Sequence, residues 1–221
     1  MKTAMVTGAS RGIGKAIAKR LEEGGFKIVT PTRAELDLSD LKSVQAYLLK
    51  NQELKIDVLV NNAGENIVQN FADIDLQTWT RIQNINLNST FLLTQAFGKK
   101  MVEHQWGRVL NVASLFSFLT REGRGSYTAS KTALLGLTRT AAVEWSKHNV
   151  LVNALSPGFV DTELTRKNNS PERIAEICKA IPLGRMSTPA ELAETAYFLV
   201  SEQNTSLTGQ NIVVDGGYSI L

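Results

Sequence analysis

The segment Thr3-Ala4-Met5-Val6-Thr7-Gly8-Ala9-Ser10-Arg11-Gly12-Ile13-Gly14 decides the fold class of this chain. It passes from a short apolar run through a glycine-rich turn into a stretch with helical periodicity that extends to about Gly24. A strand, a glycine turn and a helix in this order are typical of open α/β sheets. The same alternation continues along the chain, so this segment is expected to be the first unit of a larger sheet.

Six short apolar runs lack polar alternation, which is typical of strands covered on both faces of a parallel sheet. They are Thr3–Thr7, Phe26–Thr30, Asp57–Asn61, Arg108–Val112, Val150–Leu155 and Gln210–Val214. Six helical patterns accompany them: Gly12–Gly24, Asp40–Asn51, Asn88–His104, Tyr127–Lys147, Pro171–Ala180 and Pro189–Ser201. We therefore expect an α/β fold, a doubly wound parallel sheet with helices on both faces, in a single domain spanning residues 1–221.

Composition excludes several classes of protein. The 221 residues hold 24 Lys plus Arg and 21 Asp plus Glu, a net charge of +3, without a run of five like charges, so a nucleic-acid partner is not expected. One cysteine, Cys178, and two histidines argue against a disulfide framework or a metal site. No stretch approaches the roughly 18 apolar residues of a membrane span, and the N-terminal apolar run is too short for a signal peptide. We expect a cytoplasmic protein without a membrane partner.

Functional residues of such a sheet are expected outside the carboxyl ends of its strands. The residues there are Thr7–Gly14, Thr32-Arg33, Asp37-Leu38, Asn61–Gly64, Ser114 and Pro157-Gly158. Glycines at 8, 12 and 14 allow a sharp turn and let the backbone approach a pyrophosphate at the N-terminus of the first helix. A glycine-rich turn without a ligand is the alternative interpretation.

Tyr127 and Lys131 are four residues apart on a predicted helix and therefore share one face. An ammonium near a phenol favours the phenolate and lowers the phenol pKa, which makes tyrosine a usable proton donor and acceptor. Ser114, at the end of a strand, could hold a carbonyl oxygen beside the Tyr127 hydroxyl. Taken singly, Ser114 also fits a loop cap and Asn86 a buried helix residue.

Together these residues resemble the short-chain dehydrogenase/reductase family. The matching motifs cover nearly the whole chain in the family's order: Thr7-Gly8-x3-Gly12-x-Gly14, Asn61-Asn62-Ala63-Gly64, Asn86, Ser114, Tyr127-x3-Lys131, Pro157-Gly158, Ile181–Arg185, Thr208–Gln210 and Asp215–Gly217. The chain most resembles the 3-oxoacyl-(acyl-carrier-protein) reductase group. The resemblance implies a Rossmann-like fold and an NAD(P)-dependent oxidoreductase.

The resemblance also implies a role for each matching position. Tyr127 is expected to protonate the substrate oxygen, Ser114 to polarise the carbonyl, and Lys131 to bind the nicotinamide ribose and lower the Tyr127 pKa. Asn86 is expected to hold a water that links Lys131 to solvent. The cofactor-binding set implied is Gly8, Ser10, Arg11, Gly12, Ile13, Gly14, Arg33, Asp37, Leu38, Asn62, Ala63, Gly64, Tyr127, Lys131, Pro157, Gly158, Val160 and Thr162. In this set Asp37 and Leu38 face the adenine, Asn62–Gly64 the adenosine ribose, and 157–162 the nicotinamide.

One segment departs from the family pattern. A helix normally separates the second and third strands, whereas Thr30–Asp37 runs almost directly from one strand end to the next, so this helix is expected to be missing. At the end of the second strand an NAD enzyme offers a carboxylate to the ribose, but here Thr32 and Arg33 occupy that place. Arg33 and Arg11 could clamp a 2′-phosphate, which favours NADP(H) over NAD(H). The alternative is that Arg33 pairs with Glu35.

Substrate and assembly are less defined by the sequence. Leu115–Leu119 could form an apolar pocket wall or a packing contact, and the segment of about 161–181 is expected to be a substrate loop. Lys99, Lys100 and Lys147 could attract an acidic carrier protein, although solvated helix faces look the same. Small residues in Asn88–His104 and Tyr127–Lys147 permit close helix packing, and the resemblance implies a homodimer or homotetramer across them.

Three functions are therefore weighed. The first is an NADPH-dependent reductase of a 3-oxoacyl thioester or similar ketone. The second is a sugar, polyol or other secondary-alcohol dehydrogenase. The third is a non-catalytic dinucleotide-binding regulatory protein, against which the presence of Tyr127, Lys131, Ser114 and Asn86 argues. The arginine at 33 favours the first.

Overall fold

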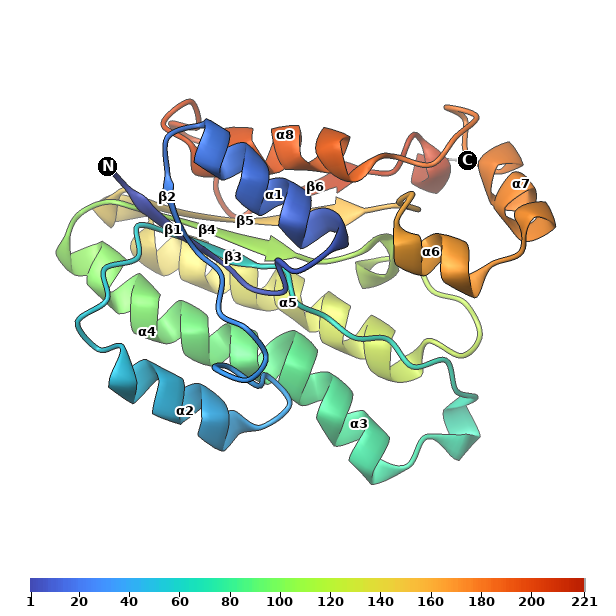
Figure 1. Ribbon diagram of the computed structural model, residues 1–221, viewed down its shortest axis with the longest axis horizontal. Coiled ribbons are helices and arrows are strands. Elements are labelled where there is room, and N and C mark those ends of the chain that lie inside the picture. Colours follow the sequence, from blue (N-terminus) through green and yellow to red (C-terminus); the bar gives the residue numbers. More distant parts are fainter. Residues whose placement is uncertain (221) are drawn as a thin grey trace.

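The computed structural model contains one sheet of six parallel strands in the order β2-β1-β3-β4-β5-β6 (Figure 1). The structure describes residues 1–220, the side chains of Leu164 and Asn168 excepted. The strands are β1 (Thr3–Val6), β2 (Lys27–Val29), β3 (Val58–Asn61), β4 (Gly107–Val112), β5 (Val150–Pro157) and β6 (Asn211–Val214). All residues of β3, β4 and β5 are buried, as their unbroken apolar runs predict. The expected doubly wound sheet is confirmed.

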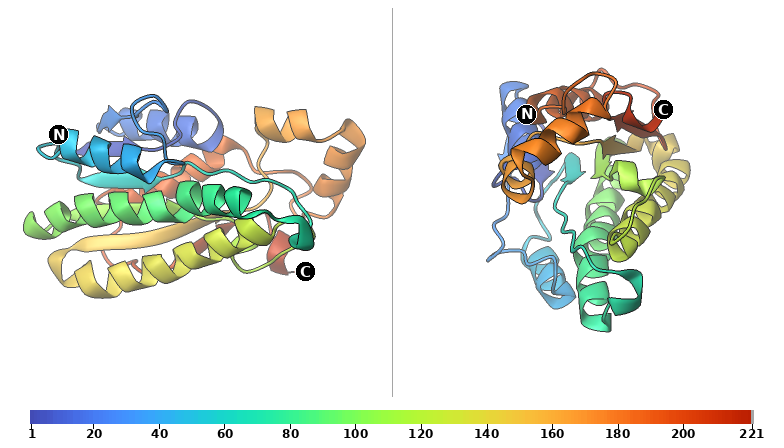
Figure 2. Two further views of the ribbon diagram at one scale, coloured as in Figure 1. Left: turned by 90° about the horizontal axis from the view of Figure 1, so that it is seen from below. Right: turned by 90° about the vertical axis from the view of Figure 1, so that its right-hand side faces the viewer.

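Eight α-helices are found in the described part of the chain. They are α1 (Gly12–Glu23), α2 (Leu41–Lys50), α3 (Leu76–Gln83), α4 (Ser89–Glu103), α5 (Gly125–Trp145), α6 (Glu163–Asn168), α7 (Pro171–Lys179) and α8 (Pro189–Val200). Helices α1 and α8 cover one face of the sheet, and α2, α4 and α5 cover the other (Figure 2). Six helices agree with the predicted patterns to within a few residues, while α3 and α6 were not predicted.

The two hydrophobic cores follow from the alternation of side chains along each strand. In β1, Ala4 and Val6 pack with Ile17 of α1, whereas Met5 between them packs with Phe97 of α4 on the opposite face. All five side chains are essentially inaccessible to solvent. Each face of the sheet therefore needs its own layer of helices to shield the strands from solvent.

The expectation that the helix between the second and third strands is missing needs correction. Residues 30–40 contain neither helix nor strand, in agreement with the short Thr30–Asp37 connection, but α2 follows and separates β2 from β3. Strands β2 and β3 are parallel and pair with opposite edges of β1, so the chain must cross over β1 to begin β3. Such a crossover needs a dozen or more residues, and α2 provides it.

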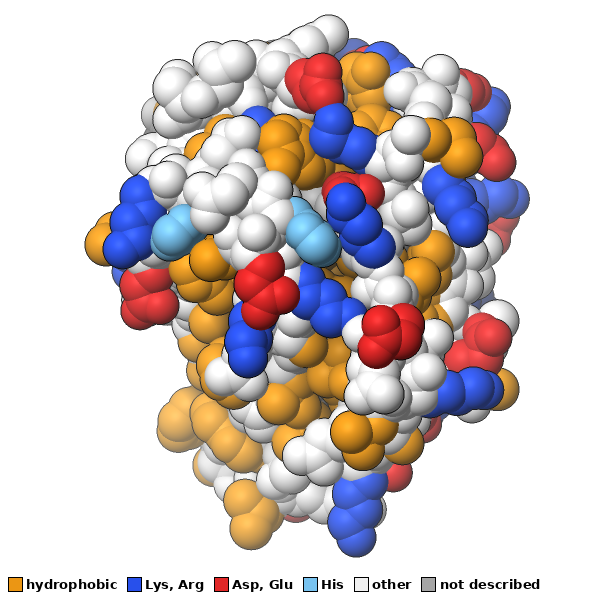
Figure 3. All heavy atoms as spheres, turned by 90° about the vertical axis from the view of Figure 1, so that its left-hand side faces the viewer, with side chains coloured by type: hydrophobic (Ala, Val, Ile, Leu, Met, Phe, Trp, Pro, Cys, Tyr) orange, Lys and Arg blue, Asp and Glu red, His pale blue; other side chains and the backbone are white. Residues whose placement is uncertain are grey.

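The strand order places a crevice at the carboxyl ends of β1 and β3. The chain leaves β1 toward β2 on one side and returns to β3 on the other, which makes this edge a topological switch point. Helices α6 and α7 project beyond the same end of the sheet (Figure 1). The opposite end, where the strands begin, carries basic and acidic side chains interspersed with one another (Figure 3). No described helix is long and apolar enough to cross a membrane.

Candidate active site

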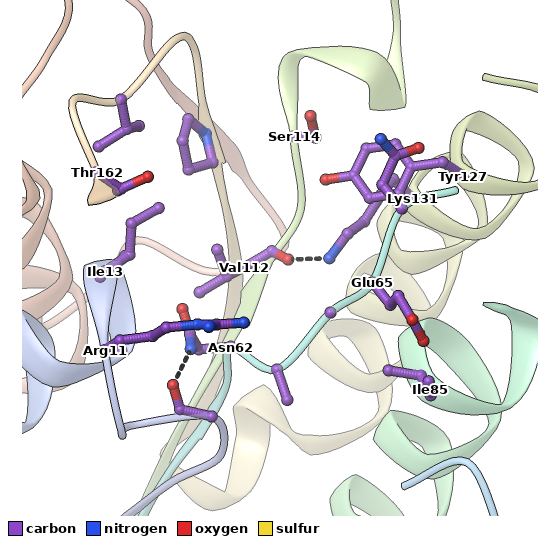
Figure 4. Close-up of a pocket in the computed structure, with 18 of the residues that line it drawn as sticks. Arg11, Ile13, Asn62, Glu65, Ile85, Val112, Ser114, Tyr127, Lys131 and Thr162 are labelled. Carbon is purple, nitrogen blue, oxygen red and sulfur yellow. Dashed lines mark hydrogen bonds between the residues drawn. The ribbon is translucent and has the colours of Figure 1, made fainter. Parts of the chain in front are cut away.

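A single cleft of about 1350 Å³ lies at the carboxyl ends of the strands and extends from the glycine turn to the start of α5 (Figure 4). All 18 residues of the predicted cofactor-binding set line it, together with Ser114. Of the four predicted catalytic residues, Ser114, Tyr127 and Lys131 line the cleft. The fourth, Asn86, is buried behind its wall.

The glycine turn is tight at Gly8 and Gly14, where a Cβ atom would collide with neighbouring atoms. Gly8 adopts φ +66° and Gly12 φ +56°, a left-handed conformation that favours glycine. A Cβ atom on Gly14 would collide with the carbonyl oxygen of Gly8 and the side chain of Asn62. Arg11 is the N-cap of α1, and no side chain accepts a hydrogen bond from the first turn there. The N–H groups of this helix end therefore face the cleft without a competing cap.

Thr7 joins the glycine turn to the segment that follows β3. Its Oγ1 accepts hydrogen bonds from the backbone N–H of Asn62 (3.0 Å) and of Ala63 (3.1 Å), and Asn62 Nδ2 donates to the Thr7 carbonyl at 2.9 Å. These bonds hold the ends of β1 and β3 together across the crevice. Thr7 belongs to the quoted motif, but its bridging role depends on a contact between residues 55 positions apart.

Ser114, Tyr127 and Lys131 point into the same end of the cleft, as Figure 4 shows. Ser114 follows β4 and begins a 3₁₀ turn, where its Oγ accepts a hydrogen bond from Phe116 N–H at 3.1 Å. Lys131 lies one helical turn after Tyr127 on α5, with its Nζ 5.8 Å from the centroid of the phenol ring. That Nζ donates a 2.7 Å hydrogen bond to the carbonyl oxygen of Val112.

Burial dominates the electrostatics of this pair. It raises the pKa of Tyr127 above its ordinary value, against lowering contributions from the Ser114 hydroxyl and the Arg124 charge. Burial also lowers the pKa of Lys131 to about 8, because a desolvated ammonium is disfavoured. The net direction for the Tyr127 pKa is therefore upward, because desolvation outweighs the lowering contributions. The expected effect of Lys131 on the Tyr127 pKa stays a prediction.

Asn86 braces the wall of the site. It lies in a π-helical turn, Asn84–Asn88, and is 1% exposed. Its Oδ1 accepts from Glu65 N–H at 2.8 Å, and its Nδ2 donates to the Glu65 carbonyl at 2.9 Å and to Ser130 Oγ at 3.0 Å. Asn86 Oδ1 and Lys131 Nζ both lie within 3.4 Å of where a Cβ on Gly64 would be. Asn86 and Lys131 thus flank Gly64, and π-helical turns often occur at functional sites. The water expected between Asn86 and Lys131 stays a prediction.

At the far end of the cleft, Arg33 is largely exposed and contacts Asp37, with Nε 3.4 Å from Oδ2. Glu35 instead accepts from the N–H and the hydroxyl of Thr32, both at 2.8 Å. The alternative in which Arg33 pairs with Glu35 is therefore wrong. Hydrogen bonds from Ser39, with a contribution from Arg33, lower the pKa of Asp37. Arg11 extends into the cleft from the start of α1 (Figure 4).

The segment after β5 closes the remaining side. Gly158 donates from its N–H to the carbonyl of Val214 at 2.9 Å, and a Cβ there would collide with Asp215. Val160 forms a parallel bridge to Ser187, and Thr162 caps α6 by accepting from Thr165 N–H at 3.1 Å. The predicted substrate segment thus holds two short helices, α6 and α7.

Several residues of the cleft were not predicted from sequence. Glu65 and Arg81 form an ion pair of 2.8 Å, and Arg121 and Arg124 lie near the tyrosine. Of the apolar stretch Leu115–Leu119, the described side chains that line the cleft are Leu115 and Phe116. Leu115 and Phe116 belong to the stretch that the sequence suggested as a pocket wall, whereas Glu65, Arg81, Arg121 and Arg124 stand in no local motif that could have suggested them.

A doubly wound sheet with a glycine-lined cleft at its switch point defines the class of dinucleotide-binding α/β proteins. A family model described as short chain dehydrogenase matches residues 2–44, and one described as Enoyl-(Acyl carrier protein) reductase matches residues 30–219. The chain belongs to the short-chain dehydrogenase/reductase family and is an oxidoreductase, which confirms the resemblance seen in the sequence.

Relatives with different activities are similarly close. The chain is 36% identical over 240 residues to a 3-oxoacyl-(acyl-carrier-protein) reductase of Aquifex aeolicus, covering 98% of this chain and 96% of the relative. It is 37% identical over 241 residues to a 2-dehydro-3-deoxy-D-gluconate 5-dehydrogenase of Bacillus subtilis, with 98% and 94% covered. The 3-oxoacyl reductases are thus among the similar proteins beside sugar-acid dehydrogenases.

Solved structures give the same picture. A gluconate 5-dehydrogenase from Burkholderia cenocepacia in complex with NADP and tartrate has a TM-score of 0.88 at 27% identity, covering 100% of this chain and 96% of its own. A 4-hydroxyisoleucine dehydrogenase complexed with NADH has a TM-score of 0.93 at 28% identity, with 100% and 99% covered. The fold is therefore shared by enzymes that bind either cofactor.

Proposed function

We propose that this protein uses a nicotinamide dinucleotide, preferably NADP(H), to interconvert a carbonyl compound and its secondary alcohol, with reduction as the working direction. The observation that carries the proposal is the shape of the cleft, in which the glycine turn and the Ser114–Tyr127–Lys131 group face one continuous cavity. A dinucleotide is long enough to extend between two such ends.

The residues present fit the cofactor. The start of α1 is not capped by a side chain, and the glycine turn before it lines the cleft, so an extended pyrophosphate can approach the backbone N–H groups there. In this proposal Asp37 and Leu38 lie along the adenine, Asn62–Gly64 along the adenosine ribose, and 157–162 along the nicotinamide. When bound, the cofactor supplies a hydride to the carbonyl carbon or accepts one from the alcohol.

The side chains at the tyrosine end move the proton. Tyr127 donates its hydroxyl proton to the substrate oxygen as the carbonyl carbon gains a hydride, so the carbonyl becomes an alcohol. Ser114 holds the same oxygen by a hydrogen bond. Lys131 binds the nicotinamide ribose, and Asn86 holds a water through which the proton is replaced from solvent. The raised pKa of Tyr127 supports the donor role, because the hydroxyl is protonated at neutral pH.

The preference for NADP(H) rests on Arg11 and Arg33. Both line the cleft, and Arg33 follows the end of β2, where Thr32 stands in place of a carboxylate. Guanidinium groups bind a 2′-phosphate bidentately, whereas a carboxylate would repel it. Asp37 neutralises part of the Arg33 charge at 3.4 Å. Arg11 therefore carries much of the preference in this proposal.

The second candidate is a sugar or polyol dehydrogenase, because the same residues can run the reaction toward oxidation. One observation favours it over a long-chain acyl thioester. The apolar part of the wall contributed by 115–119 is limited, since Phe118 is 44% exposed and is not among the described lining residues. A docked carrier protein stays a possible source of substrate under the first candidate.

We also propose a homodimer or homotetramer built across α4 and α5. These helices run alongside each other over one face of the sheet (Figure 2), and they expose Phe91 and Val143. The mass of the protein in solution, measured by light scattering, tests this directly, and a monomer would contradict it.

The function is tested by following NADPH consumption with an acetoacetyl thioester and with 5-ketogluconate, each beside NADH. Turnover that selects NADPH and is lost in Tyr127→Phe supports the proposal. The variant should still bind NADPH with the affinity of the original protein, because the hydroxyl acts on the substrate. Turnover retained by Tyr127→Phe would contradict the assignment of the proton donor.

A further inference from the structure

Two arginines stand at the tyrosine end of the cleft without a role in the proposed chemistry. The Cζ atoms of Arg121 and Arg124 each lie 5.5 Å from the centroid of the Phe116 ring. Phe116 in turn packs edge-to-face against Tyr127, with ring centroids 6.3 Å apart. All four residues line the cleft. The two guanidinium groups therefore lie beside the aromatic ring that packs against the proton donor.

The positive charge at this point is not balanced within the described part of the chain. Six other arginines have a carboxylate within 4 Å: Arg20, Arg33, Arg81, Arg166, Arg173 and Arg185. Neither Arg121 nor Arg124 takes part in a described ion pair. Glu65, the acidic residue of the nearby wall, is already paired with Arg81 at 2.8 Å. Two uncompensated cations thus face the cleft together.

Arg124 is also left with an unused donor. Its Nε is buried and has no hydrogen-bond partner among the described residues. Burial and the neighbouring charge of Arg121 lower the pKa of Arg124, which means that its charged form is held in an unfavourable place. Arg124 is moreover the N-cap of α5, and the first turn of this helix has no acidic residue. The N-terminus of a helix carries partial positive charge, which further disfavours the Arg124 cation. A bound anion relieves all of these costs at once.

We propose that the substrate is a hydroxy acid or keto acid whose carboxylate binds Arg121 and Arg124 while its reacting carbon lies between Ser114 and Tyr127. This inference rests on the proposed function and specifies its substrate class. A carboxylate matches the fork of a guanidinium and accepts two parallel hydrogen bonds from it. A neutral polyol can accept a hydrogen bond from the buried Nε, but it leaves the two positive charges unbalanced.

Binding is tested first, with succinate as a carboxylate probe that cannot be reduced. Its affinity for the NADPH complex is measured by calorimetry for the original protein and for Arg124→Gln, Arg121→Gln and Arg139→Gln. Arg139 is the matched control, since it is an exposed residue of the same helix that does not line the cleft. We expect at least a tenfold loss of affinity in Arg124→Gln, a smaller loss in Arg121→Gln and none in the control. Equal affinity in all four proteins, or no binding to the original protein, overturns the proposal.

Turnover then separates the possible sources of the anion. D-gluconate and D-glucitol share a carbon chain and differ by the carboxylate, so oxidation by NADP⁺ should favour gluconate, and Arg124→Gln should remove that preference. Equal oxidation of gluconate and glucitol overturns the carboxylate assignment. So does a preference for acetoacetyl-CoA that is lost in Arg124→Gln, because Arg124 would then bind the phosphates of the thioester. Tyr127→Phe keeps the two proposals distinct: it should bind succinate normally and turn over neither compound. Turnover by that variant contradicts the proposed function, while unchanged succinate binding in Arg124→Gln contradicts this inference alone.

Discussion

The Nζ of Lys131 donates a 2.7 Å hydrogen bond to the carbonyl oxygen of Val112, the last residue of β4. The lysine is 3% exposed, so its ammonium is taken out of water and held by the backbone at the end of the central strands. This relationship fixes the position of the lysine beside Tyr127 before any ligand enters. It also makes the folded protein sensitive to the protonation of one residue.

Stability should therefore depend on pH through Lys131. Burial lowers its pKa from 10.5 to about 8, so between these values the unfolded chain holds a proton that the folded chain has released. Stability then rises with pH across this window, since more protons are bound in the unfolded state. The gap corresponds to roughly 3 kcal/mol at most. Urea unfolding from pH 7 to 11 measures it, and Lys131→Met is the control that should lack the rise. Parallel curves for the two proteins would contradict the burial of a charged lysine.

The rate of reduction should fall at high pH, because it depends on the proton of Tyr127. Its pKa lies above the ordinary value because the phenol is buried, so the proton that reduction needs is present at neutral pH. Reduction is expected to be constant there and to fall as the pH passes the raised pKa, while oxidation rises over the same range. Profiles of kcat/KM against pH in both directions check this. A kcat/KM for reduction that increases with pH would contradict the role of Tyr127 as proton donor. Tyr127→Phe should lower kcat by about 10²- to 10⁴-fold.

The glycine turn should not tolerate a methyl group at position 14. A Cβ there meets the Gly8 carbonyl and the Asn62 side chain, so Gly14→Ala must displace the backbone that we propose to receive the pyrophosphate. We expect NADPH affinity to fall by tenfold or more. Gly136→Ala, within α5, is the matched control, because a Cβ there has nothing within 4 Å in the same chain. That change should keep NADPH binding and raise stability by about 0.5–1 kcal/mol. Equal NADPH binding in the two variants would show that the turn is not the pyrophosphate site.

Cofactor choice should respond to the charge at position 33. Arg33→Asp removes a guanidinium and places a carboxylate near the 2′-position. The binding free energy of NADPH relative to NADH should therefore become less favourable by about 1 to 3 kcal/mol. Asp37→Asn should shift the ratio the other way, since it frees Arg33 from the 3.4 Å contact. Dissociation constants for both cofactors, with Arg139→Asp as a surface control, provide the comparison. A ratio that is unchanged in Arg33→Asp would assign the preference to Arg11.

The sequence by itself determined the class of fold and most of the cleft. Apolar runs and helical periodicity are local patterns, so the six strands and six of the helices could be placed from them. The parallel order then brings the residues after each strand to one edge, and all 18 predicted cofactor-binding residues line the cleft there. Helices α3 and α6 were missed because they are short, eight and six residues, and leave a weak periodic signal.

Only the tertiary structure decided how the charges in the cleft are balanced. The partner of Arg33 is Asp37 rather than Glu35, and Arg124 lies with a buried, unpaired nitrogen beside Phe116. The pKa values of Tyr127 and Lys131 likewise follow from desolvation by segments far away in the chain. Burial depends on which distant residues come into contact, and a local pair such as Arg33–Asp37 depends on how the loop between its two residues folds. Spacing along the sequence specifies neither. The motifs therefore predicted the chemistry of the site, whereas the folded arrangement decided which of its charges are paired.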